Sequence, residues 1–220
     1  LKDKRVGIIG TGATAVQCVP HLGASAKELF VFQRTPSSID VRNNRETPQE
    51  FVDSLEPGWQ YRRMENFNKL VTGAEQDEDL VNDGWTDIFR NLTGIAAKTA
   101  AKKLGRRLTP QERAELMEMS DYRKMETIRT RAQEIVDDPK IAESLKPYYR
   151  QFCKRPCFHD EYLPTFNRPN VHLVDTEGKG IEQFTETGLI ANGEHYELDC
   201  IIFATGFEVG TSYTRRSGYD

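Results

Sequence analysis

Hydrophobic and polar positions follow two different patterns along the chain. Apolar runs of strand length lie at 5–10 (RVGIIG) and 28–34 (ELFVFQR), with a short helical pattern at 13–22 between them. Strand, glycine turn, helix and strand at this spacing predict the opening of a parallel α/β domain. Strand periodicity returns after Cys153, with VHLVD at 171–175, a hairpin that turns near Asn192-Gly193, and a further buried strand in CIIFATG.

Residues 47–149 show the second pattern, which is that of charge-rich helices with few strand signals. The tetrapeptide TPQE occurs at 47–50 and at 109–112. Each copy predicts a helix start, with Thr as N-cap, Pro at the first helical position and Glu closing a capping box. DPKIAESL at 138–145 predicts another helix that begins from Asp138.

The sheet is begun before the helical block and completed after it. We therefore predict an α/β fold in which a Rossmann-like domain, a parallel sheet with a hairpin or β-meander, spans 1–46 and 150–208. A helical insertion over 47–149 interrupts this domain. We expect residues 209–220 to begin the return into another domain.

Composition narrows the function classes. The chain has 220 residues and 37% hydrophobic content, with a mean hydropathy of −0.64, which suits one or two domains with their own cores. Its 30 basic and 34 acidic residues are interspersed, so we expect no nucleic-acid or membrane partner. With four cysteines and no long apolar run, a cytoplasmic protein is expected. The start LKDKRV, without an initiator Met, suggests a piece of a longer protein.

The glycine turn is the first candidate site. Residues 10–15 (GTGATA) match G-x-G-x-x-[GA] directly after a strand and at the start of a helix. The first glycine permits the tight turn, the second leaves room for a pyrophosphate, and the small third residue lets helix and strand pack closely. Helix N–H groups then hold the phosphate. The pattern predicts dinucleotide binding, and a purely structural turn is the alternative. The predicted contacts are Gly10, Thr11, Gly12, Ala13, Thr14, Ala15 and Gln17.

The end of the second strand indicates which dinucleotide binds. An NAD or FAD site usually places Asp or Glu roughly 20 residues after the turn, to bond the ribose hydroxyls. Here Gln33, Arg34 and Thr35 stand at that place, and they are the predicted cofactor contacts there. A guanidinium suits a 2′-phosphate through charge-assisted hydrogen bonds, so NADP is favoured over NAD. An ordinary solvated arginine at a strand end is the alternative.

Four motifs in order carry a resemblance to a known family: GTGATAVQCVPHL, LFVFQRTPSSIDVRNN, KRPCFHDEYLPTFNRPNVHLVDT and DCIIFATGFE. Together they resemble the Baeyer–Villiger monooxygenases, flavoproteins that use FAD, NADPH and O2 to insert an oxygen atom beside a ketone carbonyl. The resemblance implies that this chain is the NADP(H)-binding part of such an enzyme and takes part in ketone oxidation. It also implies that FAD binds in a domain outside these residues, so this chain alone is expected to be inactive. It implies nothing about oligomeric state.

The resemblance also assigns roles within CKRPC, Cys153 to Cys157. Lys154 matches a residue that helps Arg34 hold the 2′-phosphate, and Arg155 matches the active-site arginine. A guanidinium is suited to the latter role because it stays cationic beside oxygen atoms that gain negative charge. The turn after the last strand, Ala204, Thr205 and Gly206, is similarly expected to be a hinge close to NADP, with a plain strand-end turn as the alternative.

Other polar groups are given structural interpretations. Cys153 and Cys157 have three residues between them, unlike C-x-x-C dithiols, and no second ligand pair accompanies them, so no redox or metal role is expected. His159-Asp160-Glu161 are consecutive loop residues that should point in different directions. The stripes of Arg and Glu over 112–134 are expected to be a solvated helix face rather than a nucleic-acid surface. Two alternative functions remain open: another two-domain flavoprotein, such as a hydroxylating monooxygenase or a reductase, and a non-catalytic NADP-binding module.

Overall fold

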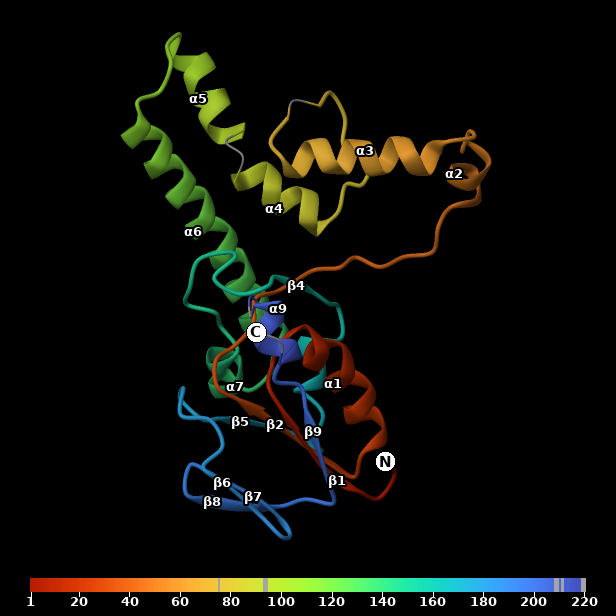
Figure 1. The fold of residues 1–220 in the computed structure, drawn as a ribbon, viewed down its shortest axis with the longest axis vertical. Coiled ribbons are helices and arrows are strands. Elements are labelled where there is room, and N and C mark those ends of the chain that lie inside the picture. Colours follow the sequence, from red (N-terminus) through yellow and green to blue (C-terminus); the bar gives the residue numbers. More distant parts are fainter. Residues whose placement is uncertain (75, 93–94, 208–209, 211, 219–220) are drawn as a thin grey trace. The chain divides into compact units, whose positions relative to one another are not determined.

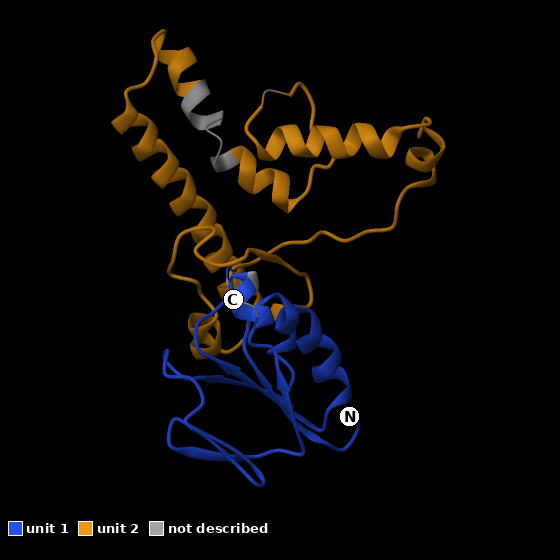
Figure 2. Cartoon of the chain, viewed as in Figure 1, with its two compact units in different colours: residues 1–37, 164–220 blue, residues 38–163 orange. Residues whose placement is uncertain are grey.

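The structure is a computed structural model that describes residues 1–74, 76–92, 95–207, 210 and 212–218 (Figure 1). The chain divides into two compact units (Figure 2). The first unit comprises residues 1–37 and 164–220, and the second comprises residues 38–163. These limits assign 38–46 and 150–163 to the mostly helical unit, whereas the domain limits expected from the sequence assign both segments to the α/β domain.

A four-stranded parallel sheet forms the centre of the first unit. Its strands are β1 (Arg5–Ile9), β2 (Glu28–Gln33), β5 (Val171–Asp175) and β9 (Cys200–Phe203), in the order β5-β2-β1-β9. Side chains alternate between the two faces of each strand. One face carries fully buried Val6, Ile8, Leu29 and Val31, where the helix α1 (Ala13–Ser25) packs. The predicted parallel α/β architecture is confirmed.

The opposite face of the sheet is covered by three short antiparallel strands, β6 (Gln183–Thr185), β7 (Gly188–Ala191) and β8 (Glu194–Glu197) (Figure 1). Phe32 and Val174 of the parallel sheet form a buried cluster there with Leu189 and Ala191 of β7. The β7–β8 hairpin turns at Asn192 and Gly193, both with positive φ, as the Asn-Gly pair predicted.

The second unit is mostly helical. It contains α2 (Gln49–Asp53), α3 (Trp59–Val71), α4 (Gly84–Leu92), α5 (Ile95–Leu104), α6 (Pro110–Ile135) and α7 (Pro139–Ser144). A two-residue parallel ribbon of β3 (Ile39–Asp40) and β4 (Cys157–Phe158) joins its two ends. The short α8 (Tyr162–Thr165) crosses the limit between the units, and α9 (Tyr213–Ser217) follows β9 in the first.

The observed N-termini of the helices can be compared with the predicted N-caps. α6 begins with the predicted capping box, in which Thr109 accepts from the Glu112 N–H and the Glu112 side chain accepts from the Thr109 N–H. Asp138 caps α7 as expected. The cap predicted at Thr47 is wrong, because α2 begins at Gln49, Pro48 takes the N-cap position and no side chain caps the helix. None of the five residues of α2 is buried, so no packing holds it in the predicted register.

Among the described residues, no helix is both long enough and apolar enough to cross a membrane. Of the expected return segment 209–220, residues 209, 211, 219 and 220 lie outside the described residues.

Candidate functional site

The glycine turn joins the carboxyl end of β1 to α1. Gly10 has a φ of +108°, and a Cβ added to it would lie 2.4 Å from the carbonyl oxygen of Ala204. Ala204 is held there because its N–H donates to the Ile9 carbonyl over 2.9 Å. The structure therefore brings together two predicted site segments, 10–15 and 204–206, that lie far apart in the sequence. Thr205 and Gly206 are exposed beyond this contact.

Gly12 and the first turn of α1 form an open cradle. Gly12 is exposed at the N-cap, and a Cβ built on it would meet nothing within 4 Å. The helix has no side-chain cap and no acidic residue in its first turn. Its leading N–H groups are therefore directed at open space, which is the arrangement that suits a phosphate. Ala15 is fully buried, so its small size lets α1 approach the sheet closely.

Two further predicted contacts line the start of α1. Thr14 and Gln17 are both exposed on this helix. The Gln17 amide donates to the Ala13 carbonyl over 3.0 Å, which keeps the side chain along the first turn. Thr11, in contrast, is 5% exposed, and its hydroxyl donates to the Thr35 carbonyl over 2.8 Å. This bond ties the glycine turn to the end of β2.

Arg34 extends from a rigid support at the end of β2. Its neighbour Gln33 is fully buried and donates to the Asp175 carboxylate over 3.3 Å. The Gln33 carbonyl accepts from both the N–H and the hydroxyl of Thr176, at 2.8 and 2.9 Å. Arg34 itself is exposed, and among the described residues its guanidinium has no ion pair or hydrogen bond. A cation on a fixed backbone is thus available beside the glycine turn. The support from Thr176 has no sequence signal of its own.

The CKRPC segment lies in the second unit. Lys154 is half-buried, with its ammonium nitrogen 5.3 Å from the centroid of the Tyr149 ring. Arg155 is exposed, and no hydrogen bond or ion pair of its guanidinium is found within the described part of the chain. The predicted sharing of one phosphate by Arg34 and Lys154 stays a prediction, and so does the catalytic role of Arg155.

The two cysteines of this segment have different surroundings. Cys157 is 5% exposed in β4, whereas Cys153 is exposed, and neither forms a disulfide. Burial raises the pKa of the Cys157 thiol, although the positive charge of Arg155 acts to lower it. A raised pKa keeps the sulfur protonated and weakly nucleophilic. Within the described residues, no group of three or more His, Cys, Asp or Glu side chains is arranged to hold a metal ion.

Asp160 is an anchor for the backbone that follows β3. Its carboxylate accepts from the N–H groups of Arg42 (2.9 Å), Asn43 (3.2 Å) and Asn44 (3.2 Å). Burial would raise the pKa of Asp160, but these hydrogen bonds and the Arg131 charge together lower it. The residue is therefore held as a carboxylate.

Most Arg and Glu residues of the stripe over 112–134 are exposed, as expected, but three cations of α6 are not. The side chains of Lys124 and Arg131 are each 16% exposed, and Arg129 is 8% exposed as a residue. The Lys124 ammonium lies 2.6 Å from Asp40 and 2.8 Å from Asp87. The expectation of a solvated face over 112–134 is thus wrong for these residues, because charge alone does not tell which partners the fold supplies. The spacing of these residues along one helix was the signal in the sequence that they could share buried partners.

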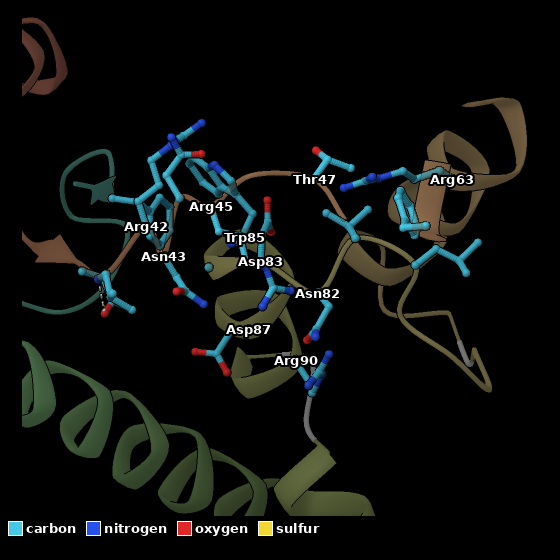
Figure 3. A pocket seen from close by; sticks show the side chains of 18 of the residues that line it. Arg42, Asn43, Arg45, Thr47, Arg63, Asn82, Asp83, Trp85, Asp87 and Arg90 are labelled. Atoms are coloured by element: carbon cyan, nitrogen blue, oxygen red, sulfur yellow. Dashed lines mark hydrogen bonds between the residues drawn. The ribbon is translucent and has the colours of Figure 1, made fainter. Parts of the chain in front are cut away.

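The second unit also contains an open cleft of about 760 Å³ (Figure 3). In this view Arg42, Arg45 and Trp85 lie on one side of the cleft and Arg63 lies on the other. Five basic and four acidic residues line it, and its Lys124 is paired with Asp40 and Asp87. The cleft has neither the mainly apolar lining typical of a small-molecule pocket nor a strong net charge, so we assign it no ligand.

Comparison with known proteins finds relatives along the whole chain, although no family model matches it. A neopentalenolactone D synthase from Streptomyces avermitilis is 55% identical over 221 residues, which cover 100% of this chain and 36% of that protein. The Baeyer-Villiger monooxygenase ATR8 from Stachybotrys chlorohalonatus is 54% identical over 217 residues, covering 99% of this chain and 34% of that protein. The chain thus spans about a third of the length of the curated relatives it matches.

Solved structures agree with these relatives. A polycyclic ketone monooxygenase from Thermothelomyces thermophila superposes with a TM-score of 0.77 at 44% identity, over 94% of this chain and 33% of that one. OTEMO in complex with FAD and NADP superposes with a TM-score of 0.64 at 28% identity, over 94% of this chain and 38% of that one. The chain is therefore homologous to part of the flavin-dependent monooxygenases. Within that class, its resemblance to the Baeyer–Villiger monooxygenases is confirmed over 99% of its length.

Proposed function

We propose that this chain is the NADP(H)-binding part of a Baeyer–Villiger monooxygenase that converts a ketone into an ester or lactone with NADPH and O2. The observation that carries the proposal is the 54% identity, over 99% of the chain, with a protein of that activity class. Relatives named for a lactone product and for polycyclic ketones support a ketone substrate with more than one ring.

The open glycine turn is the proposed site for the cofactor's phosphates. Gly12 leaves space for a pyrophosphate close to the backbone, and the uncapped N–H groups of α1 donate to its oxygens. Gly10, packed on Ala204, keeps this turn tight. Gln33 does not reach the cofactor in this proposal, because its buried amide donates to Asp175 and positions the strand end instead.

Arg34 is proposed to select NADP over NAD. It is exposed at the end of β2 and stands where a carboxylate would otherwise bond the ribose hydroxyls. Its guanidinium can donate two parallel hydrogen bonds to a 2′-phosphate. Lys154 is proposed as the second cation at this phosphate.

Arg155 is proposed to act in the oxygen-transfer step. Bound FAD, reduced by NADPH, supplies the activation of O2. The part assigned to this chain is to hold a permanent positive charge beside oxygen atoms that become negative as the ketone carbon is attacked. Arg155 is exposed and forms no ion pair with any residue that the structure describes, so its guanidinium is available for that position.

The cofactor assignment is tested by calorimetry on the 220-residue chain. Arg34→Ala should weaken binding of NADP+ by about 1.5–3 kcal/mol, the loss expected for one charged hydrogen-bond donor, and leave NAD+ binding unchanged. Lys27→Ala is the matched control, since Lys27 is exposed just before the opposite end of β2. Equal NADP+ affinities for wild type and Arg34→Ala would remove the basis for NADP selection.

The reaction is tested in the full-length protein that contains this chain. Ketones of increasing ring number are incubated with NADPH and 18O2, and the products are analysed by mass spectrometry. The proposal expects an ester or lactone that carries one 18O atom. Hydroxylated products, or NADPH oxidation without any oxygenated product, would count against a Baeyer–Villiger reaction.

A further inference from the structure

One face of α6 contacts the chain on both sides of the CKRPC segment. Figure 1 shows α6 running beside the loop that leads to β4. We propose that α6 positions the Lys154-Arg155 pair, with Asp121, Lys124 and Arg131 as its positioning residues. The functional meaning of this inference rests on the function proposed above, whereas its structural part does not.

Asp121 holds the chain just before the pair. One oxygen of its carboxylate accepts from the Gln151 N–H over 2.9 Å and from the Gln151 side-chain amide over 3.2 Å. One turn earlier on α6, Glu118 forms an ion pair with Arg150. Phe152 follows with a φ of +62°, which is unusual for a bulky residue, and its ring lies 5.5 Å from that of Phe89. The backbone is therefore fixed two residues before Lys154.

Arg131 holds the chain just after the pair. Its guanidinium donates to the Ile39 carbonyl and to the His159 carbonyl, each over 3.2 Å. It thereby clamps the ribbon in which Ile39 pairs with Cys157. The Cys157 N–H donates to the Ser38 carbonyl over 3.0 Å, so the ribbon begins two residues after Arg155.

Lys124 and Asp160 complete the clamp. Lys124 lies 2.6 Å from Asp40, the residue that pairs with Phe158 in the ribbon. Asp160 lies 4.0 Å from Arg131 and anchors three backbone N–H groups of the chain after β3. The strand β3 and the residue that follows β4 are thus tied to the same helix through charged side chains.

The spacing along α6 explains how one helix reaches both flanks. Residues 121, 124 and 131 are separated by three and seven positions, which places them on one face. The neighbouring stripe of Met125, Ile128 and Ala132 is buried, so this face is fixed against the rest of the unit. A site carried by a long packed helix is held more accurately than a loop held only by its own ends.

The need for such a frame follows from the exposure of Arg155. Arg155 is exposed, so its direction is set by the backbone that carries it. Transition-state contacts are sensitive to small displacements, and a shift of about 1 Å can cost about a hundredfold in rate. The anchors at 151 and at 157–159 restrict the intervening five residues from both ends.

The test compares hydrogen exchange of the 153–159 amides in the 220-residue chain. Asp121→Ala and Arg131→Ala should each raise the exchange rate of these amides about tenfold, which corresponds to about 1.4 kcal/mol of local opening. Asp121→Asn keeps the acceptor for Gln151 and should restore protection. Arg123→Ala is the matched control, because Arg123 is an exposed arginine on the same helix.

The same variants are then compared in the full-length enzyme. Asp121→Ala should lower kcat for ester formation about tenfold or more, with Asp121→Asn close to wild type. Unchanged exchange at 153–159 in both alanine variants would overturn the inference. Raised exchange with unchanged kcat and NADPH affinity would support the positioning role but overturn the function proposed for the Lys154-Arg155 pair. If Arg131→Ala unfolds the second unit, Asp121→Ala alone decides.

Discussion

The two segments with proposed roles, one in each unit, are built in different ways. The glycine turn of the first unit consists almost entirely of backbone: two glycines, an uncapped helix start and one hydroxyl bond from Thr11. The CKRPC segment of the second unit depends on charged side chains, with Asp121 and Arg131 of α6 holding its flanks. The proposed phosphate site uses N–H groups that the turn itself supplies, whereas the cation proposed for catalysis, exposed Arg155, must be aimed by its neighbours.

Charge placement shows the same difference. In the second unit, hydrogen bonds overcome burial to lower the pKa of Asp160, and they likewise overcome it to raise the pKa of Lys124. Both residues are therefore kept ionised where burial alone would favour their neutral forms. The turn of the first unit contains no comparable brace among its described residues; its Arg34 is exposed to solvent. The glycine turn can thus be disturbed by substitutions that change the shape of the backbone. The CKRPC segment can be disturbed by substitutions that remove charges.

The largest effect is expected at Arg155. In the full-length enzyme, Arg155→Ala should reduce ester formation about 10²–10³-fold, because one donor to the developing negative charge is lost. NADP+ binding should be largely retained. Lys154→Ala should instead raise KM for NADPH with less effect on kcat, as expected for lost uniform binding. Steady-state kinetics of both variants with saturating ketone measure the difference, and normal ester formation by Arg155→Ala would withdraw its catalytic assignment.

A smaller effect separates the two glycines of the turn. Gly10→Ala should lower the free energy of unfolding by about 1–3 kcal/mol or more. Alanine disfavours the positive φ at this position, and its Cβ would clash with the Ala204 carbonyl. Gly12→Ala should leave stability within about 0.5 kcal/mol, since its Cβ meets open space. It should instead weaken NADP+ binding about tenfold, because the added methyl group would push the pyrophosphate away from an N–H donor and so break one charge-assisted hydrogen bond.

Urea unfolding and calorimetry on the two glycine variants measure these effects. The assignment of Gly12 to the cofactor would fail if Gly12→Ala bound NADP+ as tightly as wild type. The structural assignment of Gly10 would fail if Gly10→Ala were as stable as Gly12→Ala.

The smallest effect concerns the two copies of TPQE. Thr109→Ala should destabilise the second unit by about 1 kcal/mol, because it removes one side of the capping box of α6. Thr47→Ala should have no measurable effect, since α2 starts without a side-chain cap. Thermal unfolding of both variants checks the contrast, and equal losses would show that Thr47 caps a helix after all.

The same cap predicts a pH dependence. Hydrogen bonds from Arg106 and from the Thr109 N–H lower the pKa of Glu112 from 4.5 to about 2. A carboxyl with a lowered folded-state pKa stabilises the fold above its unfolded pKa and loses this contribution as the pH falls toward the folded value. The stability difference between wild type and Glu112→Gln should therefore be constant above pH 4.5 and shrink between pH 4.5 and about 2. A difference that grows on acidification would contradict the cap.

Periodicity and residue type predicted the segments of the first unit whose shape depends on local backbone conformation. The glycine turn, β1, α1, β2, β5 and the Asn-Gly hairpin all depend on residues within short windows, so their patterns are legible along the chain. The same holds for the cap at Thr109, where Thr and Glu lie three residues apart. The failure at Thr47 shows the limit of such motifs, because an identical tetrapeptide lacked the packing that α6 receives.

The tertiary structure alone decided which distant residues meet. The sequence determined that a glycine turn, a strand-end arginine and a Lys-Arg pair exist, because each is a matter of residue type at a given spacing. It did not determine that Ala204 closes against Gly10, or that Arg131 reaches Ile39 across 92 positions of sequence. Those contacts arise only when burial of apolar faces brings remote segments together, and charged partners are then chosen by proximity in space.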